Sequence, residues 1–365
     1  MVNAFARTAL MLCAAISAAA AERPVFPGKN WREASPESQG VDPARLREAM
    51  NYLDAHAGIG GATEAVVVRN GRLIWRGAHS GAFHPVWSCT KSFTSTVLGL
   101  LVDDGKCTLD TRAVEHVPAL AEFYSAYSQI KLRHLASMTS GYDGERGKIR
   151  PGTPWGEPAE YLTPAAPLFP AGTAFRYHDP AVHLLGYILT RVAGEPLKAL
   201  FRRRIADPIG MSRWDWVDLG LADNIVLSGP SGIYGLGVLT TPQELARFGY
   251  LFLNRGNWNG KQLISASWVD QATSTQVPAS LPPSPGTGSY GFFWWTNGAS
   301  AGGKRPWPSA PARTFAARGA SGNFCFVIPE WNMVIVRMST AWGPDNVNQV
   351  WDTFFARLAQ ALDLR

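Results

Sequence analysis

The chain has 365 residues, of which 46% are hydrophobic and 17% charged, so it can bury a large core without depending on disulfides or a metal ion. Its formal net charge is +6, and the Lys and Arg residues are scattered along the chain apart from Arg202–Arg204. On a helix these three side chains would point in different directions, so a nucleic-acid partner is disfavoured. The length fits one large domain or two closely packed ones.

The N-terminus predicts a signal peptide. Arg7 precedes the apolar run Ala9–Ile16, and Ala19–Ala21 supplies the small residues that a signal peptidase recognises. We therefore expect residues 1–21 to be removed and the mature protein to be periplasmic or secreted. No later apolar stretch is long enough to predict stable insertion into a membrane.

Three cysteines, Cys89, Cys107 and Cys325, follow this segment. An odd number cannot pair completely, and no Cys-x-x-Cys spacing indicates a zinc or redox site. The sequence leaves open whether Cys107 and Cys325 form a disulfide. The histidine spacings match no zinc-binding helix, and phosphate-binding glycine loops are absent, so we expect no metal and no other cofactor.

The first regular elements after the signal peptide have clear local signals. Asp42 followed by Pro43 is typical of a helix start, and the helix should run to about Ala57. Two β-prone stretches then flank Asn70-Gly71, which is the strongest two-residue signal for a hairpin turn. Residues 91–103 are apolar with few breakers, which predicts a helix that is buried on most sides.

The rest of the chain alternates between helical and strand-like patterns. From 110 to 235, helical stretches alternate with loops rich in Pro and Gly, and strand signals are weak. Beyond this insertion the pattern predicts a helix, two strands and a final helix, at residues 242–253, 323–328, 333–339 and 346–362.

These elements predict an α+β fold. Residues 22–109 and 236–365 should form one antiparallel sheet flanked by helices from both chain ends, and residues 110–235 should form a mostly helical second lobe. A cleft between the two lobes is the expected place for a ligand.

Ser88 and Lys91 are the first candidate catalytic residues. A serine hydroxyl becomes a good nucleophile when a nearby base takes its proton, and a neutral lysine can be that base. Their spacing of three places both side chains on one face of a helix start. There, burial and the helix dipole should lower the pKa of Lys91, and free N–H groups such as that of Ser88 can stabilise an oxyanion. The alternative is a solvated pair on a helix, which the apolar context of residues 92–103 disfavours.

The segment Trp87–Ser95 (W-S-C-T-K-S-F-T-S) resembles the active-site serine motif of the penicillin-recognising serine hydrolases. This superfamily includes class C β-lactamases, esterases and 6-aminohexanoate-dimer hydrolases. The likeness extends over roughly residues 35–360 and includes Leu132–Gly141, Phe169–Thr173, Asp207–Met211 and Thr241–Gly249. It implies a β-lactamase/transpeptidase-like fold and hydrolysis through an acyl-enzyme on Ser88.

In that superfamily the second motif is Tyr-x-Asn, and Tyr177-His178-Asp179 occupies its place. The resemblance implies that Tyr177 shares a proton with Lys91 and delivers it to the leaving group, whereas the alternative is an amphipathic core residue. Asp179 departs from the motif, because a carboxylate would hold Lys91 charged or repel an anionic substrate. We expect His178, beside Tyr177, to face the cleft.

The third motif, Lys-Thr-Gly or His-x-Gly, is replaced by Arg318-Gly319-Ala320. Gly319 allows a substrate carbonyl to approach the backbone, so the N–H of Ala320 is the candidate second oxyanion donor. Arg318 fits equally well as an anchor for a substrate carboxylate or as a partner in a surface salt bridge. Trp294 fits either the core or the lining of an acyl pocket.

A competing pattern, Gly298-x-Ser300-x-Gly302, matches the nucleophile elbow of other hydrolases. The residues that follow it cannot continue as a helix, so we interpret Ser300 as a loop residue.

The sequence therefore predicts an exported hydrolase of small esters or amides. The nearest alternative is a class C β-lactamase or D-alanyl-D-alanine carboxypeptidase, and the alternative of another class is a non-catalytic peptidoglycan-binding or sensor protein. The oligomeric state is not indicated.

Overall fold

The computed structural model describes residues 24–144 and 163–362. The predicted signal peptide, 1–21, lies outside these residues. A six-stranded antiparallel sheet with the order β10-β11-β12-β13-β1-β2 forms the centre of the fold. Its strands are β1 Ala65–Arg69, β2 Arg72–Arg76, β10 Trp295–Thr296, β11 Phe315–Gly319, β12 Asn323–Ile328 and β13 Met333–Arg337. Because β1 pairs with β13, strands from both halves of the chain share one sheet, as predicted.

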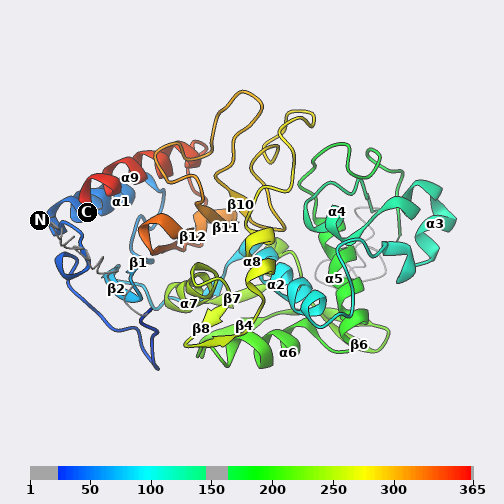
Figure 1. Ribbon diagram of the computed structural model, residues 1–365, viewed down its shortest axis with the longest axis horizontal. Helices are drawn as coiled ribbons and strands as arrows, with labels where there is room; N and C mark the ends of the chain where they lie inside the picture. Colours follow the sequence, from blue (N-terminus) through cyan, green and yellow to red (C-terminus); the bar gives the residue numbers. More distant parts are fainter. Residues whose placement is uncertain (1–23, 145–162, 363–365) are drawn as a thin grey trace, which may run out of the picture.

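Helices cover both faces of this sheet. On one face α1 (Pro43–His56) packs against α9 (Val347–Ala361), so the first and last helices lie side by side in Figure 1. On the other face α7 (Pro242–Leu253) packs against β12 and β13. The close approach needs Gly249, since an added Cβ would lie 2.6 Å from the Sγ of Cys325. The predicted α+β architecture is therefore confirmed.

Several local predictions are also confirmed. The Asp42 side chain accepts hydrogen bonds from the N–H groups of Ala44 and Arg45 at the start of α1. Asn70 and Gly71 both have positive φ, at 51° and 75°, as the tight hairpin between β1 and β2 requires. The buried helix after Ser88 is α2, Thr90–Asp103.

The inserted segment contains helices and some strands that the sequence did not predict. Its helices are α3 Ala119–Phe123, α4 Leu132–Ala136, α5 Asp179–Ala193 and α6 Leu197–Phe201, followed by a π turn at Arg202–Ala206. Its strands are β4 Trp214–Trp216, β5 Asp218–Ala222 and β6 Ile225–Ser228. β4 pairs with β7 (Val238–Thr240), which also pairs with β3 (His84–Pro85), so this small sheet joins the insertion to the segment before Ser88. Such short strands carry too few residues for an alternating pattern.

The remaining elements are short. They are β8 Asn257–Trp258, β9 Lys261–Gln262, α8 Ala266–Ala272 and the 3-10 turns Glu37–Gln39, Trp87–Cys89, Ala113–Glu115, Ser125–Gln129, Ile233–Gly235, Ala320–Gly322 and Pro329–Trp331. Ser300 lies in a loop. No helix in the described part of the chain is both long and apolar enough to cross a bilayer. Cys89, Cys107 and Cys325 are buried and free, so Cys107 and Cys325 form no disulfide here.

Candidate active site

Ser88 lies in the 3-10 turn Trp87–Cys89, which leads directly into α2. The preceding residue, Trp87, has a φ of 52°, a conformation that side chains other than glycine rarely adopt. Strained backbone of this kind is frequent where a reactive side chain is presented. Ser88 is half-buried and lines a pocket, so its hydroxyl is accessible to a ligand.

Lys91 is buried one turn later, and its amine contacts three oxygen atoms. The Nζ atom donates to Ser88 Oγ at 2.9 Å and to the carbonyl oxygen of Ser231 at 2.9 Å. It also lies 2.9 Å from Oδ1 of Asp179. Two of these contacts are hydrogen bonds, and the third is an ion pair with a carboxylate. Lys91 thus contacts both the nucleophile and a counter-ion.

The charge state of Lys91 corrects the sequence-based prediction of a neutral base. Burial lowers the pKa of Lys91, but Tyr177 and Asp179 together outweigh burial and raise this pKa above its ordinary value. Burial would raise the pKa of Asp179, yet Lys91 lowers it below the usual range. The pair is thus an ion pair. Tyr177 and the Asp179 carboxylate, which stands where the resembled motif has asparagine, are together the physical reason.

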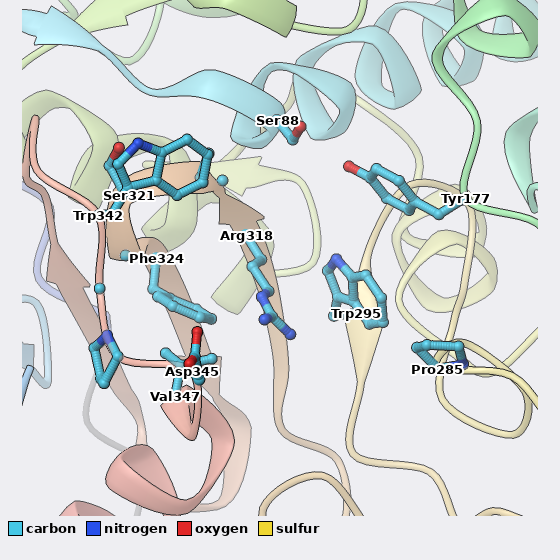
Figure 2. Close-up of a pocket in the computed structure, with 15 residues that line it drawn as sticks. Ser88, Tyr177, Pro285, Trp295, Arg318, Ser321, Phe324, Trp342, Asp345 and Val347 are labelled. Atoms are coloured by element: carbon cyan, nitrogen blue, oxygen red, sulfur yellow. The ribbon is translucent and has the colours of Figure 1, made fainter.

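Tyr177 comes from the segment just before α5, which begins at Asp179. Its ring centroid is 4.8 Å from Lys91 Nζ, and the ring stacks on Trp295 at 5.9 Å. Figure 2 shows the Tyr177 hydroxyl pointing across the pocket toward Ser88. The structure therefore brings Ser88, Lys91 and Tyr177 together, although they come from two distant parts of the sequence.

Two residues that the sequence analysis did not single out lie next to Lys91: Ser231 contacts its amine, and His183 contacts Ser231. Ser231, in the loop after β6, supplies the carbonyl that Lys91 contacts, and its Oγ lies 3.0 Å from Nε2 of His183. Burial lowers the pKa of His183 to about 3, so this imidazole is neutral. The only sequence signal was the spacing of four between Asp179 and His183, which places both on one face of α5.

The candidate oxyanion donors lie where two segments meet. Gly319 ends β11, and an added Cβ there would lie 2.2 Å from the carbonyl oxygen of Val86 and 3.1 Å from the N atom of Ser88. Only glycine permits this approach. The packing sets the next residue, Ala320, beside the turn that carries Ser88, and both line the same pocket. Ser88 and Ala320 thus meet at the wall of one cavity, which keeps their N–H groups as the candidate oxyanion donors.

The pocket itself has a volume of about 450 Å³, which is suited to a small molecule. Its described lining residues combine a nucleophile, a glycine-rich turn, aromatic rings and one cation. They are Ser88, Tyr177, Pro285, Trp295, Arg318, Gly319, Ala320, Ser321, Gly322, Phe324, Trp342, Gly343, Pro344, Asp345 and Val347.

Arg318 is the one cation among these lining residues. Its guanidinium carbon lies 5.4 Å from the ring centroid of Trp295 and 5.5 Å from that of Phe324, and Figure 2 shows it between these rings. Nη1 donates to Oδ1 of Asn348 at 3.4 Å. Within the described residues no carboxylate lies at ion-pair distance. The Arg318 side chain is half-buried, and this burial lowers its pKa.

Two predicted contacts are not found in the pocket. Trp294 is fully buried and packs on Phe252 and Phe315, whereas its neighbour Trp295 lines the cavity. Trp294 lies just before β10 and packs in the core, so the prediction selected the wrong tryptophan. His178 is buried rather than facing the cleft, because its Nε2 lies 2.6 Å from Oδ1 of Asp143.

Comparison with known proteins agrees with this geometry. A family model described as Beta-lactamase matches residues 46–359. The 6-aminohexanoate-dimer hydrolase of Paenarthrobacter ureafaciens is 24% identical, over 78% of this chain and 74% of that protein.

Solved structures show the same fold. A penicillin-binding protein homologue from Caulobacter crescentus superposes with a TM-score of 0.67 at 18% identity, over 87% of this chain and 99% of the other. A family VIII carboxylesterase gives a TM-score of 0.65 at 18% identity, over 87% and 97% of the two chains.

Proposed function

Because the chain belongs to the beta-lactamase family of serine hydrolases, whose model matches residues 46–359, we propose that it cleaves small carboxylic esters or amides through an acyl-enzyme on Ser88. The single observation that carries this proposal is the 2.9 Å contact between Lys91 Nζ and Ser88 Oγ at the wall of a pocket. Relatives that act on amides and esters support the choice of substrate class.

In the proposed acylation step, Ser88 Oγ attacks the carbonyl carbon of the substrate. Tyr177 Oη takes the serine proton as general base, and the Lys91 ammonium stabilises the negative charge that passes between the two oxygens. The carbonyl oxygen becomes an oxyanion held by the N–H groups of Ser88 and Ala320. When this intermediate collapses, the bond to the alcohol or amine breaks, and Tyr177 returns the proton to that leaving group.

Deacylation repeats the same proton transfers with water. Tyr177 takes a proton from a water molecule whose oxygen attacks the acyl carbon, and the oxyanion forms again in the same place. Collapse breaks the bond to Ser88 Oγ, which regains its proton from Tyr177, and the free carboxylic acid leaves. No step requires a neutral Lys91, which is consistent with its contacts to three acceptors.

The substrate preference can be tested by comparing the hydrolysis of an ester with that of a β-lactam. We expect the protein to hydrolyse p-nitrophenyl acetate faster than a chromogenic cephalosporin, because the Lys-Thr-Gly triplet of the resembled β-lactamases is absent. Rapid turnover of the cephalosporin without esterase activity would instead favour a β-lactamase or a D-alanyl-D-alanine carboxypeptidase.

Arg318 leads to a prediction about charged substrates. A guanidinium that lies between two aromatic rings and has no carboxylate partner among the described residues is suited to receive one from the substrate. Replacing Arg318 by Met keeps the apolar stem and removes the charge. We expect kcat/KM for a p-nitrophenyl hemisuccinate to fall by about 10- to 100-fold, the value of a charged hydrogen bond. Hydrolysis of the neutral acetate ester should change little.

The matched control is Arg313→Met, since Arg313 is exposed and pairs with Glu330 away from this pocket. Equal losses on the charged and neutral esters in Arg318→Met would contradict a role in binding the carboxylate.

We further propose that this hydrolase is exported after removal of residues 1–21, which rests on the N-terminal sequence pattern alone. N-terminal sequencing of the mature chain tests this, and retention of Met1 on protein recovered outside the cytoplasm would argue against it.

A further inference from the structure

The turn that carries Ala320 has an unusual backbone conformation. It is a 3-10 turn, Ala320–Gly322, which connects β11 to β12. Ser321 has a φ of 61° and Gly322 a φ of 71°, so two consecutive residues are in the left-handed region. A serine in this conformation is strained and keeps it only when its surroundings fix it. The structure shows what fixes it.

All three carbonyl groups of this turn accept hydrogen bonds from buried side chains. Asn323 Nδ2 donates to the carbonyl oxygen of Ala320 at 2.7 Å. Nη1 of Arg337 donates to the carbonyl oxygens of Ser321 and Gly322, at 3.0 and 3.1 Å. Because each carbonyl fixes the plane of its peptide, the backbone that follows the Ala320 N–H cannot rotate without breaking one of these bonds.

Burying the charged side chain of Arg337 at the end of β13 costs folding free energy. It is 1% exposed at the end of β13, where the other residues, Met333–Val336, are apolar. Its remaining donors, Nε and Nη2, also bond to carbonyl oxygens, those of Gly61 and Ile59. No carboxylate of the described chain lies at ion-pair distance, and burial lowers the pKa of Arg337 to about 10. A buried cation without a counter-ion destabilises the fold unless its hydrogen bonds are complete.

Glycine at position 322 fits the same arrangement. A Cβ added to Gly322 would lie 2.1 Å from Nη1 of Arg337, so the guanidinium packs directly against the turn. On the other side of Ala320, Gly319 packs against Val86 and Ser88. Ala320 is therefore held from both directions along the chain.

We propose that Arg337, together with Asn323, is a positioning residue that holds the N–H of Ala320 in place for the oxyanion. This inference rests on the proposed function, because it concerns the donor that the proposed reaction uses. Neither side chain is among the residues that line the pocket, so both act through the turn rather than on the substrate.

The chain provides a matched control in Arg247. This arginine is 2% exposed, and it donates to the carbonyl oxygens of Ile209, Gly28 and Lys29, at 3.1, 2.8 and 2.7 Å. Its burial therefore matches that of Arg337, and it too donates to three or more backbone carbonyls, while its Nε also lies 3.4 Å from Oε2 of Glu244. Its partners lie outside the residues that line the pocket. Replacing either arginine by lysine keeps the charge and removes the planar fork of donors.

The experiment measures the second-order rate at which a fluorophosphonate modifies Ser88, followed by intact-mass analysis. The serine oxygen bonds to phosphorus and fluoride leaves, while the phosphoryl oxygen must enter the oxyanion site. We expect Arg337→Lys to lower this rate by about 10- to 100-fold, approaching the effect of removing one oxyanion donor. Arg247→Lys should label within about twofold of the wild type. In ester hydrolysis, kcat should fall in Arg337→Lys while KM stays within about twofold.

The outcomes separate this inference from the proposed function. A wild-type protein that gains no adduct would overturn the proposed function, and the positioning role with it. Labelling of wild type and of both lysine variants at the same rate would leave the function standing and overturn the positioning role. If Arg337→Lys does not fold, Asn323→Ser carries the same test. Failure of both to fold, with Arg247→Lys folded, would show a role in stability alone.

Discussion

Replacing Tyr177 by Phe should lower kcat for a p-nitrophenyl ester by about 10²- to 10⁴-fold, the usual contribution of a positioned general base or acid. Lys91 forms an ion pair with Asp179, and its pKa is raised above the ordinary value, so as an ammonium it has no lone pair with which to accept the proton of Ser88. The Tyr177 hydroxyl, which points toward Ser88 in Figure 2, is the remaining group in place. Steady-state kinetics of the two proteins measure the effect.

Tyr187→Phe is the matched control for this variant. It makes the same chemical change further along α5, where the Tyr187 hydroxyl contacts Asp223 rather than the pocket. We expect its kcat to stay within about threefold of the wild type. If Tyr177→Phe kept wild-type kcat, the proton would have to leave Ser88 by another route, and Lys91 would return as the candidate base.

Asp179→Asn should change the pH dependence of the reaction. The carboxylate helps to raise the pKa of Lys91 against the effect of burial. Without it, one of the two groups that raise this pKa is lost, so we expect the pKa of Lys91 to fall. The alkaline limb of the kcat/KM profile should move to lower pH. A profile measured from pH 5 to 11 on both proteins tests this.

The stability of the protein should depend on the same pair. Lys91 has a raised pKa in the fold, so its stabilisation is complete below the ordinary value of 10.5 and is lost as pH rises through the folded value. Asp179 has a lowered pKa, so its stabilisation is present above the ordinary value of 3.8 and is lost as pH falls through the folded value. The difference in unfolding free energy between wild type and Asp179→Asn should therefore not change with pH between 3.8 and 10.5.

Asp110→Asn serves as a control, because Asp110 is an exposed carboxylate paired with Lys131 and Arg133. It should leave the kcat/KM profile unchanged. An unchanged alkaline limb in Asp179→Asn would mean that the ion pair does not set the charge of Lys91.

Local signals predicted much of the fold. A two-residue hairpin turn needs positive φ at both central positions, and Asn and Gly are the residues that adopt it most readily, so the β1–β2 turn could be located to the residue. Asp42 followed by Pro43 placed the start of α1 equally well. Both features depend on neighbours in sequence and not on tertiary contacts.

Other features of the site depend on packing between distant segments. The assignment of Trp294 instead of Trp295 to the pocket follows from this, because a strand as short as β10 gives no alternation from which to read its faces. The contact of Ser231 with Lys91 involves a backbone carbonyl, which every residue has, so no residue type could indicate it. The motif match at Tyr177 placed the tyrosine correctly beside Ser88 and Lys91.

The charge of Lys91 could not be predicted from the sequence either. The sequence indicated both a buried lysine, whose pKa should fall, and a carboxylate at position 179, which should raise it. Deciding between opposite effects required the 2.9 Å distance between Lys91 Nζ and Asp179 Oδ1. In the same way, Arg337 has no local signal, since its four carbonyl partners come from two separate loops.

The whole proposed reaction depends on the Ser88 hydroxyl as the nucleophile. Intact-mass analysis of wild type and Ser88→Ala after treatment with a fluorophosphonate tests this role. We expect the wild type to gain one adduct, mapped to Ser88 by peptide mass, and Ser88→Ala to gain none. A folded wild-type protein that stays unmodified, or an equal adduct on both proteins, would contradict it.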